Sequence, residues 1–135
     1  MKYSIVAFLI IYLLMLGCSP LRKINMKNQS DGDVEITWTL KEQDSLFLSP
    51  FFMSNSRTVK FELKPEKPYN EVKMSFGMGS WPKDTLAIIT DRLESLRIKS
   101  ANGTIFLDSS KKIYSFLFNR RKGIGKRKIE ILITK

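Results

Sequence analysis

Apolar and polar side chains alternate strictly along residues 34–40, and this is the clearest pattern in the chain. The apolar positions are Val34, Ile36, Trp38 and Leu40, and every residue between them is Glu or Thr. Successive side chains of a β-strand point to opposite faces of its sheet, so a period of two predicts a strand with one buried face. Half-buried strands of this kind are typical of antiparallel sheets.

Four other segments show the same period. Residues 57–63, 69–78 and 129–134 alternate clearly, and residues 21–28 alternate weakly. Short alternating segments bounded by turn residues predict strands. Residues 95–108 predict a hairpin, because Asn-Gly at positions 102 and 103 separates two short arms and both residue types accept the positive φ of a tight turn.

Two segments change to a helical period. In residues 82–91 apolar side chains recur at spacings of three and four, and Pro82 and Asp84 stand where helix N-termini favour them. Residues 111–119 show similar spacing after a pair of serines, which are good helix caps. Each segment predicts a short helix.

These elements together predict the fold class. We expect an α+β protein, mainly an antiparallel β sandwich-like domain with two short helices. Residues 24–135 form one segment of single-domain size, long enough for one hydrophobic core, and contain no internal repeat.

The apolar run at residues 46–53 has two interpretations. Proline at position 50 excludes a central strand there, so the run predicts two short edge pieces or an apolar loop. Aromatic residues of a small sandwich usually pack between its sheets, which favours a core role. Alternatively, Phe51, Phe52 and Met53 form an exposed docking edge for a partner protein.

The N-terminal segment is different in kind. Lys2 precedes an uncharged apolar run over residues 5–16, and Gly17 and Cys18 follow it. A positive tip, a short apolar core and a small residue before a processing point are typical of a secretory signal. As a helix, residues 3–16 reach about 21 Å, which is too short for a hydrocarbon core of about 30 Å.

Met15-Leu16-Gly17-Cys18 resembles the lipobox of bacterial lipoproteins, although Met15 and Leu16 depart from the usual Leu followed by Ala or Ser. The resemblance covers residues 1–18 and implies that residues 1–17 are a signal peptide, that Cys18 carries a lipid and that residues 18–23 are a short tether. Cys18 is the only cysteine, so no disulfide within the chain competes for its thiol.

Charge is unevenly distributed. Residues 18–135 hold 22 Lys or Arg and 13 Asp or Glu, a net charge of +9, yet residues 111–135 hold nine basic residues against Glu130 alone. Six basic residues form a basic run between the last predicted helix and strand: Arg120, Arg121, Lys122, Lys126, Arg127 and Lys128. A local excess of this kind bears on the partner of a protein rather than on its fold.

Two interpretations of the basic run are open, and a third is not expected. A lipid chain plus a polybasic patch is the two-signal logic of membrane attachment, which favours anionic lipid headgroups. A solvated loop without a partner is the plain alternative. Nucleic acid is not expected, because an exported protein does not meet it and no aromatic side chain interleaves these charges.

Several kinds of chemistry are excluded or unsupported. The chain has no histidine, which removes Ser-His-Asp and Cys-His catalysis and His-ligated zinc. The acidic cluster at residues 31–35 lacks EF-hand spacing and is interpreted as turn chemistry rather than as a calcium site. Glycines at 123 and 125 followed by Lys126 lack the spacing of a phosphate-binding loop. No metal and no cofactor is expected.

The sequence therefore predicts a lipoprotein of the bacterial cell envelope, anchored through Cys18 on the periplasmic or surface side. Its expected function is that of a non-enzymatic binding or assembly module that meets anionic lipid headgroups or an envelope protein. The alternative is an envelope enzyme or enzyme inhibitor that acts on cell-wall or glycan material through carboxylates.

Overall fold

The structure is a computed structural model that describes residues 21–42 and 56–135. The expectations for the signal peptide at residues 1–17, for Cys18 and for Phe51, Phe52 and Met53 lie outside the described residues.

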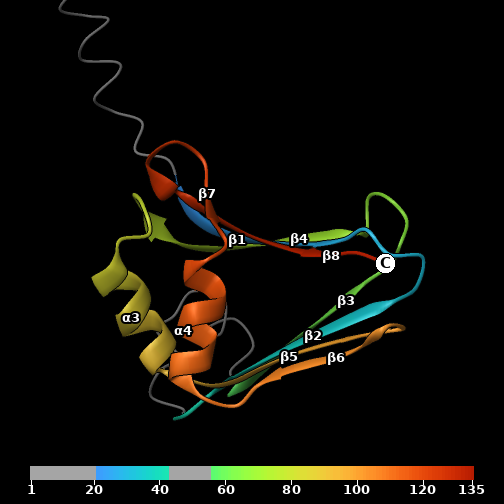
Figure 1. The fold of residues 1–135 in the computed structure, drawn as a ribbon, viewed down its shortest axis with the longest axis horizontal. Helices are drawn as coiled ribbons and strands as arrows, with labels where there is room; N and C mark the ends of the chain where they lie inside the picture. The colour runs from blue at the N-terminus through green and yellow to red at the C-terminus, as the bar shows by residue number, and fades with distance from the viewer. Residues whose placement is uncertain (1–20, 43–55) are drawn as a thin grey trace, which may run out of the picture.

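Within residues 21–42 and 56–135, two four-stranded sheets form the framework (Figure 1). Sheet A has the order β4-β1-β8-β7 and consists of β1 (Leu21–Asn28), β4 (Glu71–Met78), β7 (Arg121–Lys122) and β8 (Lys128–Ile133). Sheet B has the order β3-β2-β5-β6 and consists of β2 (Val34–Leu40), β3 (Thr58–Leu63), β5 (Leu93–Ser100) and β6 (Gly103–Leu107). All pairs are antiparallel except β1 with β8.

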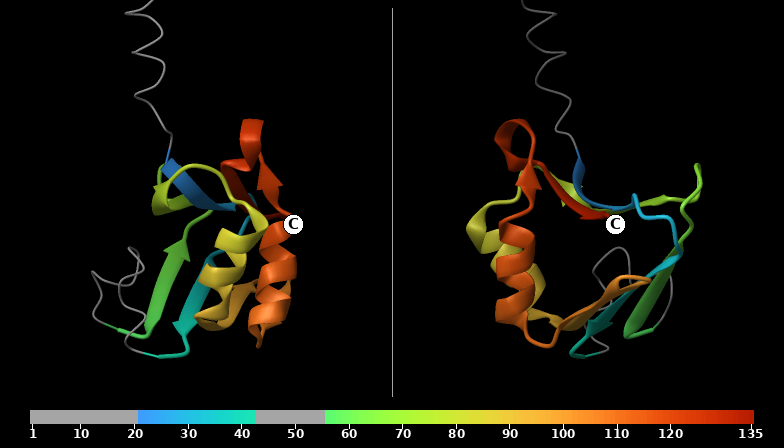
Figure 2. Two further views of the ribbon diagram at one scale, coloured as in Figure 1. Left: turned by 90° about the vertical axis from the view of Figure 1, so that its left-hand side faces the viewer. Right: turned by 45° about the vertical axis from the view of Figure 1, so that its right-hand side comes forward.

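Among the described residues, two helices accompany the sheets. They are α3 (Lys83–Asp91) and α4 (Ser110–Phe118), and a 3₁₀ turn, η2 (Ile124–Lys126), lies between β7 and β8. The sheets converge at one end and diverge at the other, where the helices stand side by side between them (Figures 1 and 2). Within the described residues, no helix is long and apolar enough to cross a membrane.

The predicted α+β sandwich-like fold is confirmed. Residues 34–40 form β2, which lies inside sheet B between β3 and β5. The hairpin is confirmed by the pairing of Ser100 with Gly103. Both helices are confirmed, and Ser109 caps α4 by accepting a hydrogen bond from the backbone N–H of Lys112. The sequence predicts a basic loop at residues 119–128, but the structure differs there, because this segment also contains the short strand β7 and the turn η2.

The core lies between the inner faces of the sheets and the inner sides of the helices. Trp38 of β2 and Trp81, just before α3, are fully buried. The other core side chains come from alternate strand positions and from one side of each helix, among them Ile24, Met26, Ile36, Leu96, Ile98, Leu86, Ile113, Leu117, Ile129 and Ile131. One face of each sheet is thus committed to packing, which leaves the other for solvent or a partner.

Asn28 fixes the turn that joins the two sheets. Its buried side-chain amide donates to the carbonyls of Gly32 and Leu63, at 2.7 and 3.1 Å. Its Oδ1 accepts from the backbone N–H and the hydroxyl of Ser30. This asparagine, rather than the neighbouring acidic residues, organises the turn between β1 and β2.

Candidate anion-binding surface

The outer face of sheet A is rich in lysine. Strand alternation places hydrophobic residues such as Ile24 and Ile129 inward and charged residues outward. We define the lysine face as the five outward lysines of this sheet: Lys23 and Lys27 on β1, Lys73 on β4, Lys122 on β7 and Lys128 on β8. Two glutamates on the same face, Glu71 and Glu130, leave it a net charge of +3.

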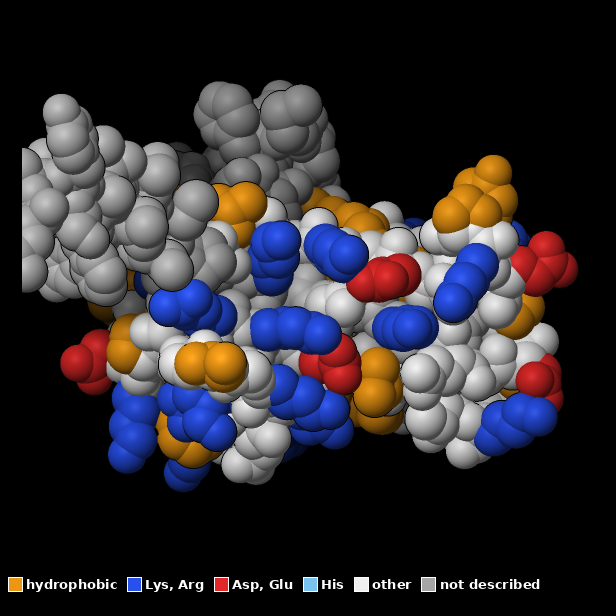
Figure 3. Space-filling model, turned by 90° about the horizontal axis from the view of Figure 1, so that it is seen from above, with side chains coloured by type: hydrophobic (Ala, Val, Ile, Leu, Met, Phe, Trp, Pro, Cys, Tyr) orange, Lys and Arg blue, Asp and Glu red, His pale blue; other side chains and the backbone are white. Residues whose placement is uncertain are grey.

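This face is uncovered within the described parts of the chain. Both helices pack on the opposite side of sheet A, between the sheets (Figure 1). Seen from outside, lysine and arginine side chains cover much of the face, with a few acidic side chains among them (Figure 3).

The register of the strands brings three lysines into one row. Lys23 is paired with Lys128 across β1 and β8, and Lys128 is paired with Lys122 across β8 and β7. Neighbouring strands are about 4.8 Å apart, and like charges placed directly opposite one another are destabilising. A row of this kind lowers the stability of the free protein and attracts an anion.

Glu130 partly offsets this repulsion. One carboxylate oxygen lies 3.1 Å from Nζ of Lys122, and the other pairs with Lys128. Hydrogen bonds from Lys128 and Lys122 hold the pKa of Glu130 below its ordinary value. Lys23 has no ion-pair partner among residues 21–42 and 56–135, so the row keeps an uncompensated positive charge.

Glu71 plays a similar part at the other edge of the face. Burial opposes its ionisation, but hydrogen bonds from Asn25 and Lys73, together with the positive charges of Lys73 and Lys27, lower its pKa below the ordinary value. Nζ of Lys73 lies 3.3 Å from the carboxylate of Glu71. Both acids of the face are therefore ionised at neutral pH. The five lysines outnumber the two carboxylates, so the face keeps its net charge of +3.

Arg121 has a structural role. Its position on β7 pairs with Ile129, so its side chain belongs to the inner face of sheet A. The guanidinium lies 3.6 Å from the centre of the Phe118 ring and donates to the carbonyls of Phe118 and Trp81, at 3.1 and 3.0 Å. A group held by a ring and two carbonyls is not free to bind a partner.

Arg120 is held in the same manner. Its guanidinium lies 3.6 Å from the centre of the Phe116 ring and donates to the carbonyl of Phe116 at 2.9 Å. Burial lowers its pKa. The predicted basic run therefore divides into three pairs: Arg120 and Arg121 stabilise the end of α4, Lys122 and Lys128 belong to the lysine face, and Lys126 and Arg127 are exposed beyond the end of sheet A.

The lysine face also contains residues that the sequence analysis did not identify. Lys23, Lys27 and Lys73 are far from the basic run in sequence, but sheet A brings them beside it. The sequence did contain a signal for these three lysines, because each occupies a polar position of an alternating segment. It could be used only once the order of the strands was known.

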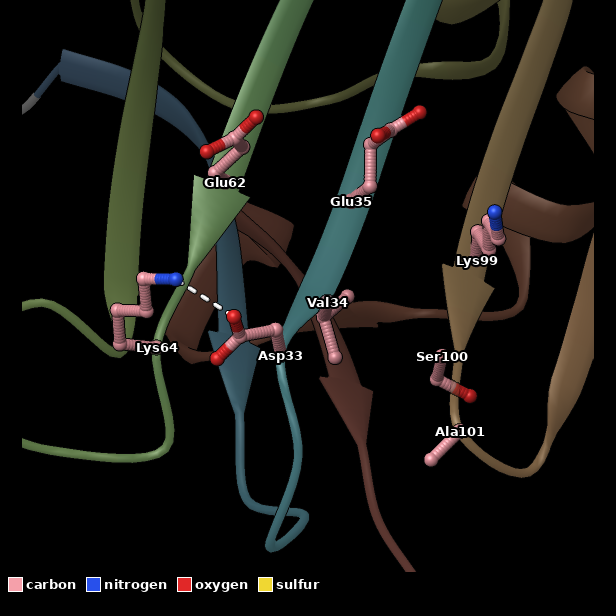
Figure 4. A pocket seen from close by; sticks show the side chains of 8 residues that line it. All are labelled: Asp33, Val34, Glu35, Glu62, Lys64, Lys99, Ser100 and Ala101. Carbon is pink, nitrogen blue, oxygen red and sulfur yellow. Dashed lines mark hydrogen bonds and ion pairs between the residues drawn. The ribbon is translucent and has the colours of Figure 1, made fainter.

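A second feature, a hollow on sheet B, bears on the alternative hypothesis that the protein is an enzyme that acts through carboxylates. It has a volume of about 410 Å³, and Asp33, Glu35 and Glu62 are among its lining residues (Figure 4). Glu35 and Glu62 are direct register partners on β2 and β3, so carboxylates do converge here.

Each carboxylate of the hollow has a lysine partner. Nζ of Lys60 lies 2.7 Å from Glu35 and 3.5 Å from Glu62, and Lys64 pairs with Asp33. The hydrogen bond from Lys60 lowers the pKa of Glu35. A general acid needs a raised pKa, so the hollow favours an ion-paired surface over a pair of catalytic carboxylates.

The acidic cluster at residues 31–35 does not gather around one point. Asp31 pairs with Lys135, Asp33 with Lys64 and Glu35 with Lys60. Within the described ranges, no group of three or more acidic, His or Cys side chains could hold a metal ion. The interpretation of this cluster as turn and surface residues agrees with these contacts.

The chain was compared with known proteins in three ways. No family model matches it, and neither the curated proteins nor the solved structures contain a significantly similar chain.

Proposed function

We propose that this protein is a membrane-anchored lipoprotein of the bacterial cell envelope, in which Cys18 carries the lipid. The folded domain is a non-enzymatic binding module whose lysine face contacts an anionic partner at the envelope. The observation that carries the proposal is the lysine face, which no described residue covers, and its position next to the first described residue, Leu21.

The anchor and the lysine face lie at the same end of the chain. Only Ser19 and Pro20 lie between Cys18 and Leu21, and the three steps along the chain span at most about 11 Å when extended. Lys23 follows two residues later and donates its backbone N–H to the carbonyl of Arg127, at 3.3 Å. A lipid on Cys18 would therefore hold both the start of β1 and the end of the basic run close to a membrane.

The energetics support a membrane surface as the site of action. A single lipid chain gives only marginal membrane binding, and a basic patch supplies the second signal that stable attachment needs. Each basic residue near an anionic surface contributes about 1 kcal/mol. The net charge of +3 on the lysine face would thus contribute about 3 kcal/mol, roughly a hundredfold in affinity.

An envelope enzyme or inhibitor that acts on cell-wall or glycan material has less support. The hollow on sheet B supplies carboxylates, but Lys60 and Lys64 neutralise them. The lowered pKa of Glu35 leaves no proton to donate at neutral pH.

Vesicle binding by residues 19–135 tests the role of the lysine face. The double variant Lys23→Glu/Lys27→Glu should bind phosphatidylglycerol vesicles at least about a hundredfold more weakly than the unaltered domain, because it changes the lysine face from +3 to −1 and so removes the whole contribution of about 3 kcal/mol. The matched control is Lys99→Glu/Lys111→Glu, which makes the same change in net charge at exposed sites on β5 and α4. Equal losses in both variants would show that only total charge matters and would contradict a specific face.

A further inference from the structure

We infer that the turn η2 is a membrane-inserting tip, in which Ile124 enters the interface of an anionic bilayer while Lys126 and Arg127 contact lipid phosphates. This inference rests on the proposed function, because it requires the domain to be held at a membrane. It adds a specific contact that neither the lipid on Cys18 nor the lysine face supplies.

Ile124 is exposed to an unusual degree. The residue is 92% exposed, the largest value among the exposed hydrophobic residues of the described chain. Leu21 and Met78, which are register partners at the same end of sheet A, are also exposed. Three apolar side chains at one end of a domain form a surface that gains stability when it leaves water.

The backbone holds the tip in place. Gly123 and Gly125 have φ of 82° and 69°, so Ile124 lies between two residues in the left-handed region. Lys126 is also left-handed, with φ of 53°, a conformation that non-glycine residues rarely adopt and that is often found at functional sites. Its carbonyl accepts from the backbone N–H of Trp81 at 2.9 Å, which ties the tip to the core.

The position of the tip fits a bilayer. The loop of β7 and η2 projects beyond sheet A at the end where β1 begins (Figure 2). The chain before Leu21 contains Cys18 and the uncharged run at residues 5–16, so the segment expected to reach the membrane joins the domain beside the tip.

The chemistry of the tip selects an anionic lipid surface. Lys126 and Arg127 are exposed and have no ion-pair or hydrogen-bond partner for their side chains within the described ranges. A basic residue pair beside an exposed isoleucine matches the phosphate layer and the acyl boundary of a bilayer, because the cations meet phosphate while the apolar side chain passes below it. A protein partner would have to supply both acids and an apolar pocket, and nothing in the described structure points to one.

Fluorescence of the intact lipidated protein in vesicles tests this inference. Cys18 is the only cysteine of the chain. When its sulfur carries the lipid, Ile124→Cys offers a single thiol for an environment-sensitive NBD label. The probe membranes are vesicles of phosphatidylcholine with about 30% phosphatidylglycerol, which gives them a negative surface potential, and they are prepared with and without lipids that carry a quencher in the acyl chain. The control is Ile105→Cys on β6 of sheet B, an exposed isoleucine that is not part of the tip.

The inference predicts a blue shift and quenching of the label at 124 and neither effect at 105. Equal quenching at both positions, or none at 124, would overturn it. The double variant Lys126→Glu/Arg127→Glu, labelled at 124, should lose most of the quenching. A further variant, Ile124→Ser, changes an exposed side chain and should leave the circular dichroism spectrum unaltered while weakening binding of residues 19–135 to the same vesicles about tenfold.

The outcomes separate this inference from the proposed function. Mass measurement of the purified protein shows whether Cys18 carries a lipid. A lipidated protein whose label at 124 stays in water would overturn the tip alone. A chain without lipid that also fails to bind anionic vesicles would overturn the proposed function itself.

Discussion

Lys23 and Lys128 face one another across the parallel strands β1 and β8. One lies near the start of the domain and the other closes the basic run near the C-terminus, yet sheet A places them side by side on one surface. Two like charges in direct register reduce the stability of a sheet unless a group of opposite charge pairs with one of them. Here Glu130 pairs with Lys128 and Lys122, so the balance between stability and anion binding depends on one carboxylate.

The first prediction concerns that carboxylate. Glu130→Gln should strengthen the binding of residues 19–135 to anionic vesicles about fivefold, because removal of one negative charge near the surface is worth about 1 kcal/mol. Sedimentation with phosphatidylglycerol vesicles measures the change. Glu94→Gln on β5 is the control, since Glu94 pairs with Arg57 on sheet B and its loss alters the total charge equally. A gain as large for Glu94→Gln would contradict the assignment of the face.

The second prediction concerns pH. The folded-state pKa of Glu130 is lowered from its ordinary value of 4.5, so the ion pairs stabilise the fold fully above that value. Their contribution is lost as pH falls through the folded-state pKa. Urea unfolding at pH 7 should show Glu130→Gln less stable than the unaltered domain by about 1 kcal/mol, and the difference should disappear at a pH well below 4.5. A difference that persists in acid would show that the glutamine acts through packing instead.

The third prediction separates structure from charge in the basic run. Arg121→Lys keeps the charge but cannot reproduce the planar contact with Phe118 together with two hydrogen bonds. We expect a loss of about 2 kcal/mol in the free energy of unfolding, since a half-buried network is broken. Vesicle affinity of the folded fraction should be unchanged. Lys122→Arg provides the control, because it preserves charge at an exposed site; a similar loss of stability there would contradict the structural role of Arg121.

The fourth prediction concerns the turn between the sheets. Asn28→Ala removes two donors from the carbonyls of Gly32 and Leu63 and one acceptor from Ser30. Buried groups left unpaired cost about 1–3 kcal/mol each when water cannot reach them, so we expect a loss of about 3 kcal/mol in urea unfolding. Asp31→Ala in the same turn removes only an exposed ion pair and should change stability by less than about 1 kcal/mol. Equal losses would show that the acidic residues hold the turn.

Much of the fold was predictable because its elements are encoded locally. The alternation at residues 34–40 and the Asn-Gly turn at 102 and 103 depend on neighbouring residues only, and both were confirmed. The parallel pairing of β1 with β8 was not predictable, since it joins segments about a hundred residues apart and no local pattern specifies a distant partner.

The candidate site was predictable only in part, for the same reason. The basic run was visible because its charges are adjacent in sequence. Its division was not foreseen, although Phe116 and Phe118 precede Arg120 and Arg121 by the four and three residues that bring side chains together at a helix end. Lys23, Lys27 and Lys73 joined the face only through strand order.

The most direct test of the central claim is palmitate labelling of the full chain in a bacterial host, combined with membrane fractionation. The account predicts that the unaltered chain incorporates label and pellets with the membrane after a high-salt wash. Cys18→Ala should lose both the label and the salt-resistant association. An unlabelled chain found in the soluble cytoplasmic fraction would contradict the anchor, and the positive charge of the domain would then have to be explained by an anionic partner other than the envelope membrane.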